Sequence, residues 1–351
     1  MAHHRRARRS HPSIRKNPSM TRTATLASLT AAGAVLALSL AGCSAPAEAP
    51  ATQQLHAAQW PRTLEIPAAQ GGEPSTLTFE AEPQTIAALD YESAEVIAEL
   101  GIGNRLVLIP EAVLNPALGG HIEQLAEVPN TIPVAMELDA ETVIALQPDL
   151  VVMSPRHGAE AAIGTVLEQA GIASLQLPSP WTSRQSVVQG IELIGEATGQ
   201  EQPAEKLVDE LEAGLASAGA AKPASSDSPR VLVLTNQAGR PFATAGQAYP
   251  LEMLRLAGAQ DLSETLGMTH TAPISAEQIV EADPDGILLI DMNGSGDRMY
   301  TELLENPAVA SLSAVAQQRI LRLEGKQVQA LGLTSTVDGL AALTGWVADL
   351  Q

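Results

Sequence analysis

Arginine, aromatic and histidine side chains recur at positions that follow predicted strands, where together they could bind a bulky anion. The guanidinium group offers a planar set of donors for carboxylate, catecholate or phosphate oxygens. Aromatic faces suit a large and partly apolar ligand. Any one of these residues is equally well explained as an ordinary loop residue, so the prediction depends on the set. The candidate ligand-binding residues are Tyr91, Arg156, His157, Trp181, Arg240, Phe242, Tyr249 and Arg298.

The rarity of these residue types elsewhere makes the set informative. The chain has 3 Trp, 3 Tyr and 2 Phe, and half of these aromatic residues occupy the predicted positions. Seven of the 20 basic residues lie in the first 42 positions, which leaves 13 in the rest of the chain. Arg156, Arg240 and Arg298 are three of those 13. We therefore expect a binding site for an anionic and partly apolar ligand.

Patterns typical of metal sites and enzymes are missing from the sequence. No group of His, Asp and Glu has the spacing of metal ligands. The stretch Gly101-Ile-Gly103 imitates a dinucleotide-binding fingerprint, but it lacks the third glycine and follows a helix rather than a strand. Gly294-Ser-Gly is not a nucleophile elbow, which needs Gly-x-Ser-x-Gly after a strand. We predict a binding protein that is not an enzyme and has no metal or cofactor of its own.

One short pattern occurs twice, in segments 138–150 and 274–287. Each copy has Ala-Glu, a short apolar run, Pro-Asp and then a strand-like tail. The residue before proline avoids the α region, so Pro-Asp marks a joint between a helix and a strand. Glu141 and Glu277 fall in the first helical turn, where a carboxylate favours the helix dipole. Helix-start chemistry alone can explain why Glu141 and Glu277 occur at these positions. The functional alternative is that they form a pair of exposed acids, one on each half of the molecule.

The first 42 residues have the pattern of a secretory signal peptide. They contain basic residues without any acid, and an apolar run from 24 to 40 follows. Leu40-Ala41-Gly42-Cys43 resembles the lipobox of bacterial lipoproteins, and Cys43 is the single cysteine of the chain. We expect lipidation of Cys43 and anchoring to the outer face of the cytoplasmic membrane. The alternative is an ordinary signal with a chance cysteine, and Met20 is a second possible start.

Charge limits the partners of the exported part. The whole chain has a formal net charge of −20. Without the seven basic residues of the leader, 13 basic residues face 40 acidic ones, so the net charge becomes −27. Such a chain is repelled by nucleic acid and by anionic lipid. An acyl chain, not charge, would therefore hold the protein at a membrane.

Alternating strand and helix patterns predict an α/β fold with two similar halves and parallel sheets. Strand-like stretches on both sides of Gly71-Gly72 predict a hairpin ahead of the first half. Helical periodicity from 183 to 218 is broken at Gly195, Gly199 and Pro203, which predicts two helices or one bent helix. The expected order is a signal peptide (1–42), a flexible tether (43–60), an N-terminal lobe with the hairpin (61–182), a connecting helix (183–220) and a C-terminal lobe (221–351).

Four segments in this order resemble a known family: 84–107, 138–150, 251–262 and 274–287. They are similar to the Fe³⁺-siderophore/haem/cobalamin class of ABC-transporter substrate-binding proteins, and the agreement extends over roughly 82–348. The resemblance implies two Rossmann-like lobes joined by a long connecting helix, with the ligand held in the cleft between them. It also implies a monomer that docks on a permease dimer, with its ATPase, through Glu141 and Glu277.

Within that family a ferric siderophore fits the predicted arginines and aromatics best, because such chelates are usually anionic and bulky. Haem is the main alternative, and cobalamin fits less well because its pockets use more aromatic surface. Where several haem-binding relatives carry a tyrosine ligand, this chain has Asn115. A lipid-anchored scaffold and an enzyme are the alternatives of another class. Candidate haem ligands are His121, His157, His270, Tyr91 and Tyr249.

Overall fold

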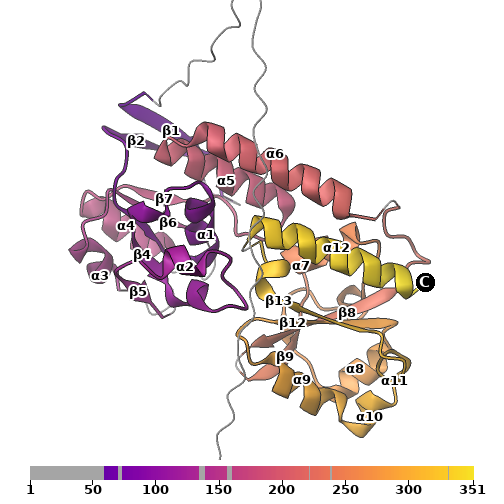
Figure 1. The fold of residues 1–351 in the computed structure, drawn as a ribbon. Coiled ribbons are helices and arrows are strands. Elements are labelled where there is room, and N and C mark those ends of the chain that lie inside the picture. Colours follow the sequence, from indigo (N-terminus) through magenta and orange to yellow (C-terminus); the bar gives the residue numbers. More distant parts are fainter. Residues whose placement is uncertain are drawn as a thin grey trace, which may run out of the picture. The chain divides into compact units, whose positions relative to one another are not determined.

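The structure is a computed structural model that describes residues 59–69, 73–133, 139–155, 160–220, 222–237, 239–330 and 332–351. Cys43, Arg156 and His157 lie outside the described residues. All the described elements belong to one unit, residues 56–351. Two α/β lobes follow each other along the chain in that unit, the first in indigo and magenta and the second in orange and yellow (Figure 1).

The N-terminal lobe has a five-stranded sheet in the order β5-β4-β3-β6-β7, and all of its pairings are parallel. Alternate residues of the central strands contact different clusters, because both faces are covered. Ile86 and Val152 pack with α1, whereas Ala87 and Val151 pack with α3 and α4. The elements are β3 (Ile86–Ala88), α1 (Tyr91–Glu99), β4 (Leu106–Pro110), α2 (Ile122–Leu125), β5 (Thr131–Ile132), α3 (Ala140–Ala145), β6 (Leu150–Met153), α4 (Glu160–Gln169) and β7 (Ser174–Gln176).

The C-terminal lobe has a mixed sheet in the order β11-β9-β8-β12-β13, with β10 also paired to β8. The predicted parallel pairing holds for β8 with β10 and β12, and for β12 with β13. By contrast, β9 is antiparallel to β8 and β11 is antiparallel to β9. This difference from the prediction arises because a tight turn, with Gly239 at φ 73°, returns the chain directly beside β8.

The strands of this lobe are β8 (Arg230–Gln237), β9 (Arg240–Ala243), β10 (Gln260–Asp261), β11 (Ala272–Pro273), β12 (Gly286–Asp291) and β13 (Ile320–Glu324). Its helices are α7 (Tyr249–Leu256), α8 (Ala276–Ala282), α9 (Gly296–Leu304), α10 (Pro307–Ala310), α11 (Ser313–Ala316) and α12 (Leu333–Asp349). Short 3-10 turns are η1 (Gly103–Arg105), η2 (Glu111–Leu114), η4 (Leu262–Glu264) and η5 (Gly325–Gln327).

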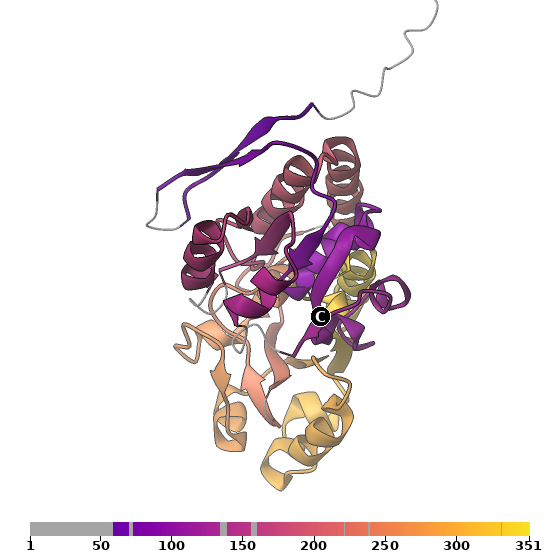
Figure 2. The ribbon, with the colours of Figure 1, turned by 90° about the vertical axis from the view of Figure 1, so that its left-hand side faces the viewer.

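The predicted hairpin is confirmed as β1 (Arg62–Ile66) and β2 (Ser75–Phe79), which pair in antiparallel register. Its base is fixed to the connector, because Arg62 donates to the carbonyl of Glu196 and forms an ion pair with Glu201. Arg62 also lies over the Trp60 ring, which meets Phe79 edge-on. The hairpin reaches from the ends of α5 and α6 along the N-terminal lobe (Figure 2).

The connector consists of two helices, α5 (Arg184–Thr198) and α6 (Glu201–Ala218), which is one of the two forms that its glycines predict. The break falls at Gly199, whose φ of 72° ends α5 in a left-handed conformation. Gly195 leaves no room for a side chain beside Ala204, so the two helices pack closely. Helix α5 contacts α1 of the first lobe, and α6 contacts α12 of the second.

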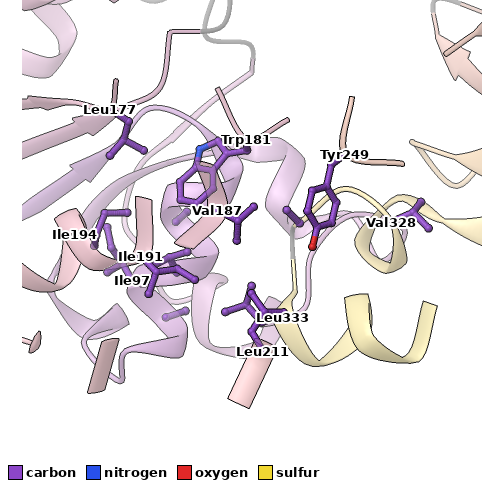
Figure 3. Close-up of a cluster of buried hydrophobic side chains, with 14 of the residues drawn as sticks. Ile97, Leu177, Trp181, Val187, Ile191, Ile194, Leu211, Tyr249, Val328 and Leu333 are labelled. Carbon is purple, nitrogen blue, oxygen red and sulfur yellow. The ribbon is translucent and has the colours of Figure 1, made fainter. Parts of the chain in front are cut away.

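One hydrophobic cluster contains buried side chains from both lobes and from the connector. Figure 3 shows Ile97 from α1, Ile191 from α5, Leu211 from α6 and Leu333 from α12 within it. A shared core of this kind joins the lobes through burial of apolar surface as well as through the chain.

The repeated Pro-Asp pattern has the same structure in both lobes. Gln147 and Asp283, the residues before the prolines, have left-handed φ values of 48° and 44°. Each following aspartate then binds the start of the neighbouring strand. Oδ2 of Asp149 accepts from the backbone nitrogens of Gln84 (2.9 Å) and Thr85 (2.8 Å) and from the Thr85 hydroxyl (2.8 Å). In the second lobe, Oδ2 of Asp285 accepts from the backbone nitrogen of Arg230 at 2.8 Å.

Replacing Asp149 with alanine is expected to lower the free energy of unfolding by about 1–2 kcal/mol, because three donors at the start of β3 lose their acceptor. The loss in free energy of unfolding is no larger because Asp149 is exposed, so water can partly replace the missing carboxylate. Urea denaturation followed by circular dichroism measures the change. Asp209→Ala, which removes an exposed aspartate from α6, is the matched control and should change stability by less than about 0.5 kcal/mol. Equal effects of the two variants would contradict the proposed role.

The same interaction should depend on pH. Partial burial acts to raise the pKa of Asp149, but the hydrogen bonds from Gln84 and Thr85 outweigh it and the net pKa is lowered. A carboxyl with a lowered folded-state pKa stabilises the protein above its unfolded-state pKa and loses this effect as pH falls through the folded value. The stability difference between wild type and Asp149→Ala should therefore be complete at pH 7 and shrink below about pH 4. A difference that grows on acidification would refute this assignment.

Candidate functional site

Asp90 organises the carboxyl ends of two strands in the N-terminal lobe. It follows β3, caps α1 and is only 6% exposed. Its Oδ1 accepts from the Ser93 nitrogen (2.8 Å) and from Trp181 Nε1 (3.2 Å). Its Oδ2 accepts from the Ser93 hydroxyl (3.0 Å) and from the Ser154 nitrogen (2.8 Å), which follows β6. Asp90 therefore holds the loop after the neighbouring strand in place.

Asn236 holds the corresponding loop, the one after β12, in place in the C-terminal lobe. It lies near the end of β8, is 3% exposed, and its Oδ1 accepts from the Met292 nitrogen at 2.5 Å, just beyond β12. Its Nδ2 donates to Asp291 Oδ1 (2.8 Å) and to Asn293 Oδ1 (2.7 Å). Sequence patterns do not reveal this network, because its partners come from different strands.

The two lobes make direct polar contacts through the loop after β4. Asn115 Nδ2 donates to the Asn293 carbonyl at 3.0 Å. On the other side of this loop, Lys326 donates from its backbone nitrogen to Ala117 (3.0 Å) and from Nζ to Pro116 (2.8 Å). A cavity of about 420 Å³ lies beside Asn115. Asn115 therefore joins the two lobes, and its side-chain amide supplies the donor for this contact.

Arg240, which is exposed, and Phe242, which is half-buried, form a cation–aromatic pair on β9. Sequence patterns predicted a loop here, but the segment is a strand, and the Arg240 guanidinium lies 5.3 Å from the centre of the Phe242 ring. Arg298 is also exposed, on α9. Within the described parts of the chain, neither Arg240 nor Arg298 forms an ion pair with an acid. Both guanidinium groups therefore have donors to offer to an anion.

Trp181 and Tyr249 lie inside the protein, which differs from their predicted positions at a binding surface. Trp181 is 4% exposed and packs over Gly190, where a Cβ atom would come within 2.5 Å of the ring. Tyr249 is the first residue of α7, is 2% exposed, and belongs to the shared core (Figure 3). Burial raises the pKa of the Tyr249 hydroxyl. Both aromatics stabilise the interior.

Tyr91 and the candidate histidines have diverse surroundings. Tyr91 is half-buried and is the first residue of α1, where the sequence predicted a loop. His121 Nδ1 lies 2.7 Å from Oε2 of the buried Glu95, and its Nε2 lies 3.8 Å from Glu99. The hydrogen bond to Glu95 raises the pKa of His121, against the opposing effect of burial. His270 contacts the Thr269 hydroxyl through Nδ1 at 3.3 Å.

Glu141 and Glu277 occupy equivalent, exposed positions in the two lobes. Each is the second residue of its helix, α3 or α8, after a capping side chain from Asp139 or Ser275. A hydrogen bond with its own backbone nitrogen and one with the Ser275 side chain lower the pKa of Glu277. The helix-start explanation thus holds for Glu277, and exposure leaves both carboxylates accessible to a partner.

Within the ranges that the structure describes, no group of three or more His, Cys, Asp and Glu side chains is arranged to hold a metal ion. None of the helices in these ranges is both long and apolar enough to cross a membrane.

Comparisons with known proteins identify relatives. The family profile described as Periplasmic binding protein matches residues 86–326. The chain is 27% identical over 269 residues to YvrC of Bacillus subtilis, named an uncharacterized ABC transporter substrate-binding lipoprotein, which covers 76% of this chain and 81% of YvrC.

Solved structures show the same fold. The apo periplasmic haem-binding protein RhuT from Roseiflexus sp. RS-1 superposes with a TM-score of 0.63 at 24% identity, over 76% of this chain and 98% of RhuT. The petrobactin-binding protein YclQ from Bacillus subtilis superposes with a TM-score of 0.64 at 18% identity, over 82% of this chain and 99% of YclQ. The predicted α/β architecture is therefore confirmed.

The pairing of His121 with Glu95 predicts a titration midpoint above the usual value of about 6.5 for histidine. Because the folded-state pKa is raised, the pair stabilises the fold below pH 6.5, and this contribution disappears as pH rises through the folded value. NMR titration of the His121 ring measures the midpoint. In Glu95→Gln the His121 midpoint should fall towards the ordinary value of histidine. A His121 midpoint that is identical in wild type and Glu95→Gln would contradict the pairing.

Proposed function

Because the chain belongs to the periplasmic binding protein family, we propose that it is the extracytoplasmic substrate-binding lipoprotein of an ABC transporter and captures a ferric siderophore for delivery to the permease. The transporter role is supported by the similarity to YvrC, whose name describes that role. Similarity in fold to a petrobactin-binding and a haem-binding protein supports an iron chelate as the ligand.

The pair formed by the exposed Arg240 and the half-buried Phe242 is the observation that carries the choice of ligand. An arginine whose guanidinium lies over an aromatic ring places its donors beside an apolar surface. Arg298 adds a second exposed guanidinium in the same lobe. These groups suit an organic chelate that is anionic at its iron centre and apolar elsewhere. Tyr91, Arg156 and His157 remain proposed contacts.

Haem is less well supported by the site. Tyr249 is buried, His121 is held by Glu95, and Asn115 donates to the opposite lobe. These three positions would have to rearrange before any of them could approach an iron atom. Trp181 is buried and donates to Asp90 from the interior, so in this proposal it positions the strand-end loops and does not contact the ligand.

The remaining parts of the proposal concern attachment and delivery. Cys43 would carry the lipid after removal of residues 1–42, and residues 43–60 would form the tether. Glu141 and Glu277 would contact basic residues of a two-fold permease, because they are exposed and occupy equivalent helix starts. The lobes themselves would span 61–182 and 221–351, with 183–220 between them, and the protein would act as a monomer.

The purified protein without its leader is expected to bind a ferric siderophore with quenching of tryptophan fluorescence. A panel of ferric hydroxamate, catecholate and citrate-type complexes, with haem included, identifies the class. Arg240→Ala should weaken binding about tenfold, because one charge-assisted contact is lost. Arg255→Ala, which removes an exposed arginine from α7, is the matched control. Absence of binding to the whole panel at micromolar concentrations would refute the ligand assignment.

Docking is tested separately from binding. The double variant Glu141→Ala/Glu277→Ala should keep the affinity of the wild type for the ligand and lose uptake in cells, since only the contact with the permease is removed. Glu168→Ala/Glu281→Ala also removes one exposed acid per lobe, so it controls for the change in charge. Normal uptake by the first variant, or equal loss in both, would show that the pair does not dock.

A further inference from the structure

The loop of residues 115–121, which follows β4 and η2, belongs to the N-terminal lobe but lies directly against the C-terminal lobe. We call it the bridging loop. The backbone nitrogen of Lys326 donates to its Ala117 carbonyl at 3.0 Å. Leu118 packs on Gly325, where a Cβ atom would come within 2.6 Å of Leu118 Cδ2. The second lobe therefore has a glycine at the point where the bridging loop approaches most closely.

The end of the bridging loop is enclosed between the two lobes. The Gly120 nitrogen donates to Oε1 of Glu95, on α1, at 3.0 Å. A Cβ atom at Gly120 would lie 3.2 Å from Oε2 of Glu95 and 3.6 Å from Cα of Gly332, the residue that precedes α12. Glu95 is only 2% exposed. The start of α12 thus covers the loop where the loop meets a buried carboxylate of the other lobe.

His121, the last residue of the bridging loop, faces two acids of α1. Its Nδ1 lies 2.7 Å from Oε2 of Glu95, and its Nε2 lies 3.8 Å from Glu99. A charged ring attracts both carboxylates. A neutral ring keeps one hydrogen bond and leaves the two acids facing each other one helical turn apart. Glu210 of α6 adds a further negative charge near Glu99.

Glu99 connects this charged group to the second lobe. It accepts a hydrogen bond from the backbone nitrogen of Leu333, the first residue of α12. The N-cap position of α12 is Gly332, which has no side chain to offer, so a carboxylate from the other lobe supplies the acceptor. Leu333 also packs with Ile97 of α1 in the shared core (Figure 3). Loss of the positive charge on His121 removes the cation that favours the ionised form of Glu99.

We propose that the bridging loop is a pH-dependent latch, which holds the two lobes together more tightly when His121 is charged than when it is neutral. Loss of the charge weakens the hold of Glu95 on the end of the loop and loosens the contact with the start of α12. On the opposite side of the loop, Lys326 and Glu324 form an ion pair with each other at 3.0 Å. The charge that changes is therefore the one between the loop and α1.

Reciprocal linkage provides the test, because a proton that favours the closed latch must bind less tightly when the latch is opened by another route. Gly325→Ala opens it from the second lobe by driving Leu118 away, and it leaves every charged group in place. NMR titration of the His121 ring, in the purified protein without its leader, should show a proton affinity about fivefold below that of the wild type. Gly345→Ala, whose added Cβ meets nothing within 4 Å, is the matched control.

Asn115→Ala is a milder variant that opens the same latch without changing charge. It removes the donor to the Asn293 carbonyl across the two lobes. The proton affinity of His121 should fall about twofold, the effect of one weak hydrogen bond. Asn104→Ala, which removes an exposed asparagine from η1, is its control and should titrate as the wild type does.

The C-terminal lobe should follow the same titration. Met292 lies beside Gly325, where Leu118 packs, so a ¹³C-labelled methionine methyl group gives a local signal, assigned with Met292→Leu. Between about pH 6 and pH 9, on both sides of the usual histidine value, this signal should shift with the midpoint of the His121 ring. The shift should disappear in His121→Gln and persist in His270→Gln, which removes an exposed histidine of the second lobe.

An unchanged proton affinity of His121 in Gly325→Ala and Asn115→Ala, or a Met292 signal that does not follow the His121 midpoint, would overturn the inference. If Gly325→Ala does not fold, Asn115→Ala decides the first point. All of these measurements are made without ligand, so they are independent of ferric-siderophore binding. Either proposal can therefore fail while the other stands.

Discussion

The positions of the strand ends in both lobes depend on an aspartate carboxylate that binds the start of the neighbouring strand. Asp149 ties the beginning of β6 to the residues before β3, and Asp285 ties the beginning of β12 to the first residue of β8. In a parallel sheet, a contact at the start of two strands sets their relative register. The loops at their opposite ends then emerge at defined positions, which is where ligands meet open α/β sheets.

A second polar contact closes each strand pair at the opposite end. Asp90 reaches from β3 to Ser154 after β6, and Asn236 reaches from β8 to Met292 after β12. Each pair is thus held at both ends by a side chain that accepts from a backbone nitrogen. The shared hydrophobic core and the α5–α6 connector then join the two sheets in one unit. Trp181 and Tyr249 are buried in this shared hydrophobic core.

Local patterns in the sequence predicted the features that depend on neighbouring residues. The hairpin, the break at Gly199 and the Pro-Asp joints follow from alternation, glycine and proline, and all three are present. Features set by distant residues were not predicted. Burial of Trp181 depends on Gly190 in another element, and β9 exists because a turn brings a short Arg-Pro-Phe-Ala segment beside β8. Tyr91 lies in the first turn of α1 rather than in a loop, because Asp90, the residue before it, caps the helix.

The two strand-end contacts differ in charge, because one is made by a carboxylate and the other by a neutral amide. In the N-terminal lobe, the Asp90 carboxylate accepts from four donors and is buried, so it has no free acceptor position for a ligand. In the C-terminal lobe the contact is a neutral amide, and the exposed groups are the guanidiniums of Arg240 and Arg298. The charged donors available to the proposed anionic ligand therefore lie on the C-terminal lobe, at Arg240 and Arg298.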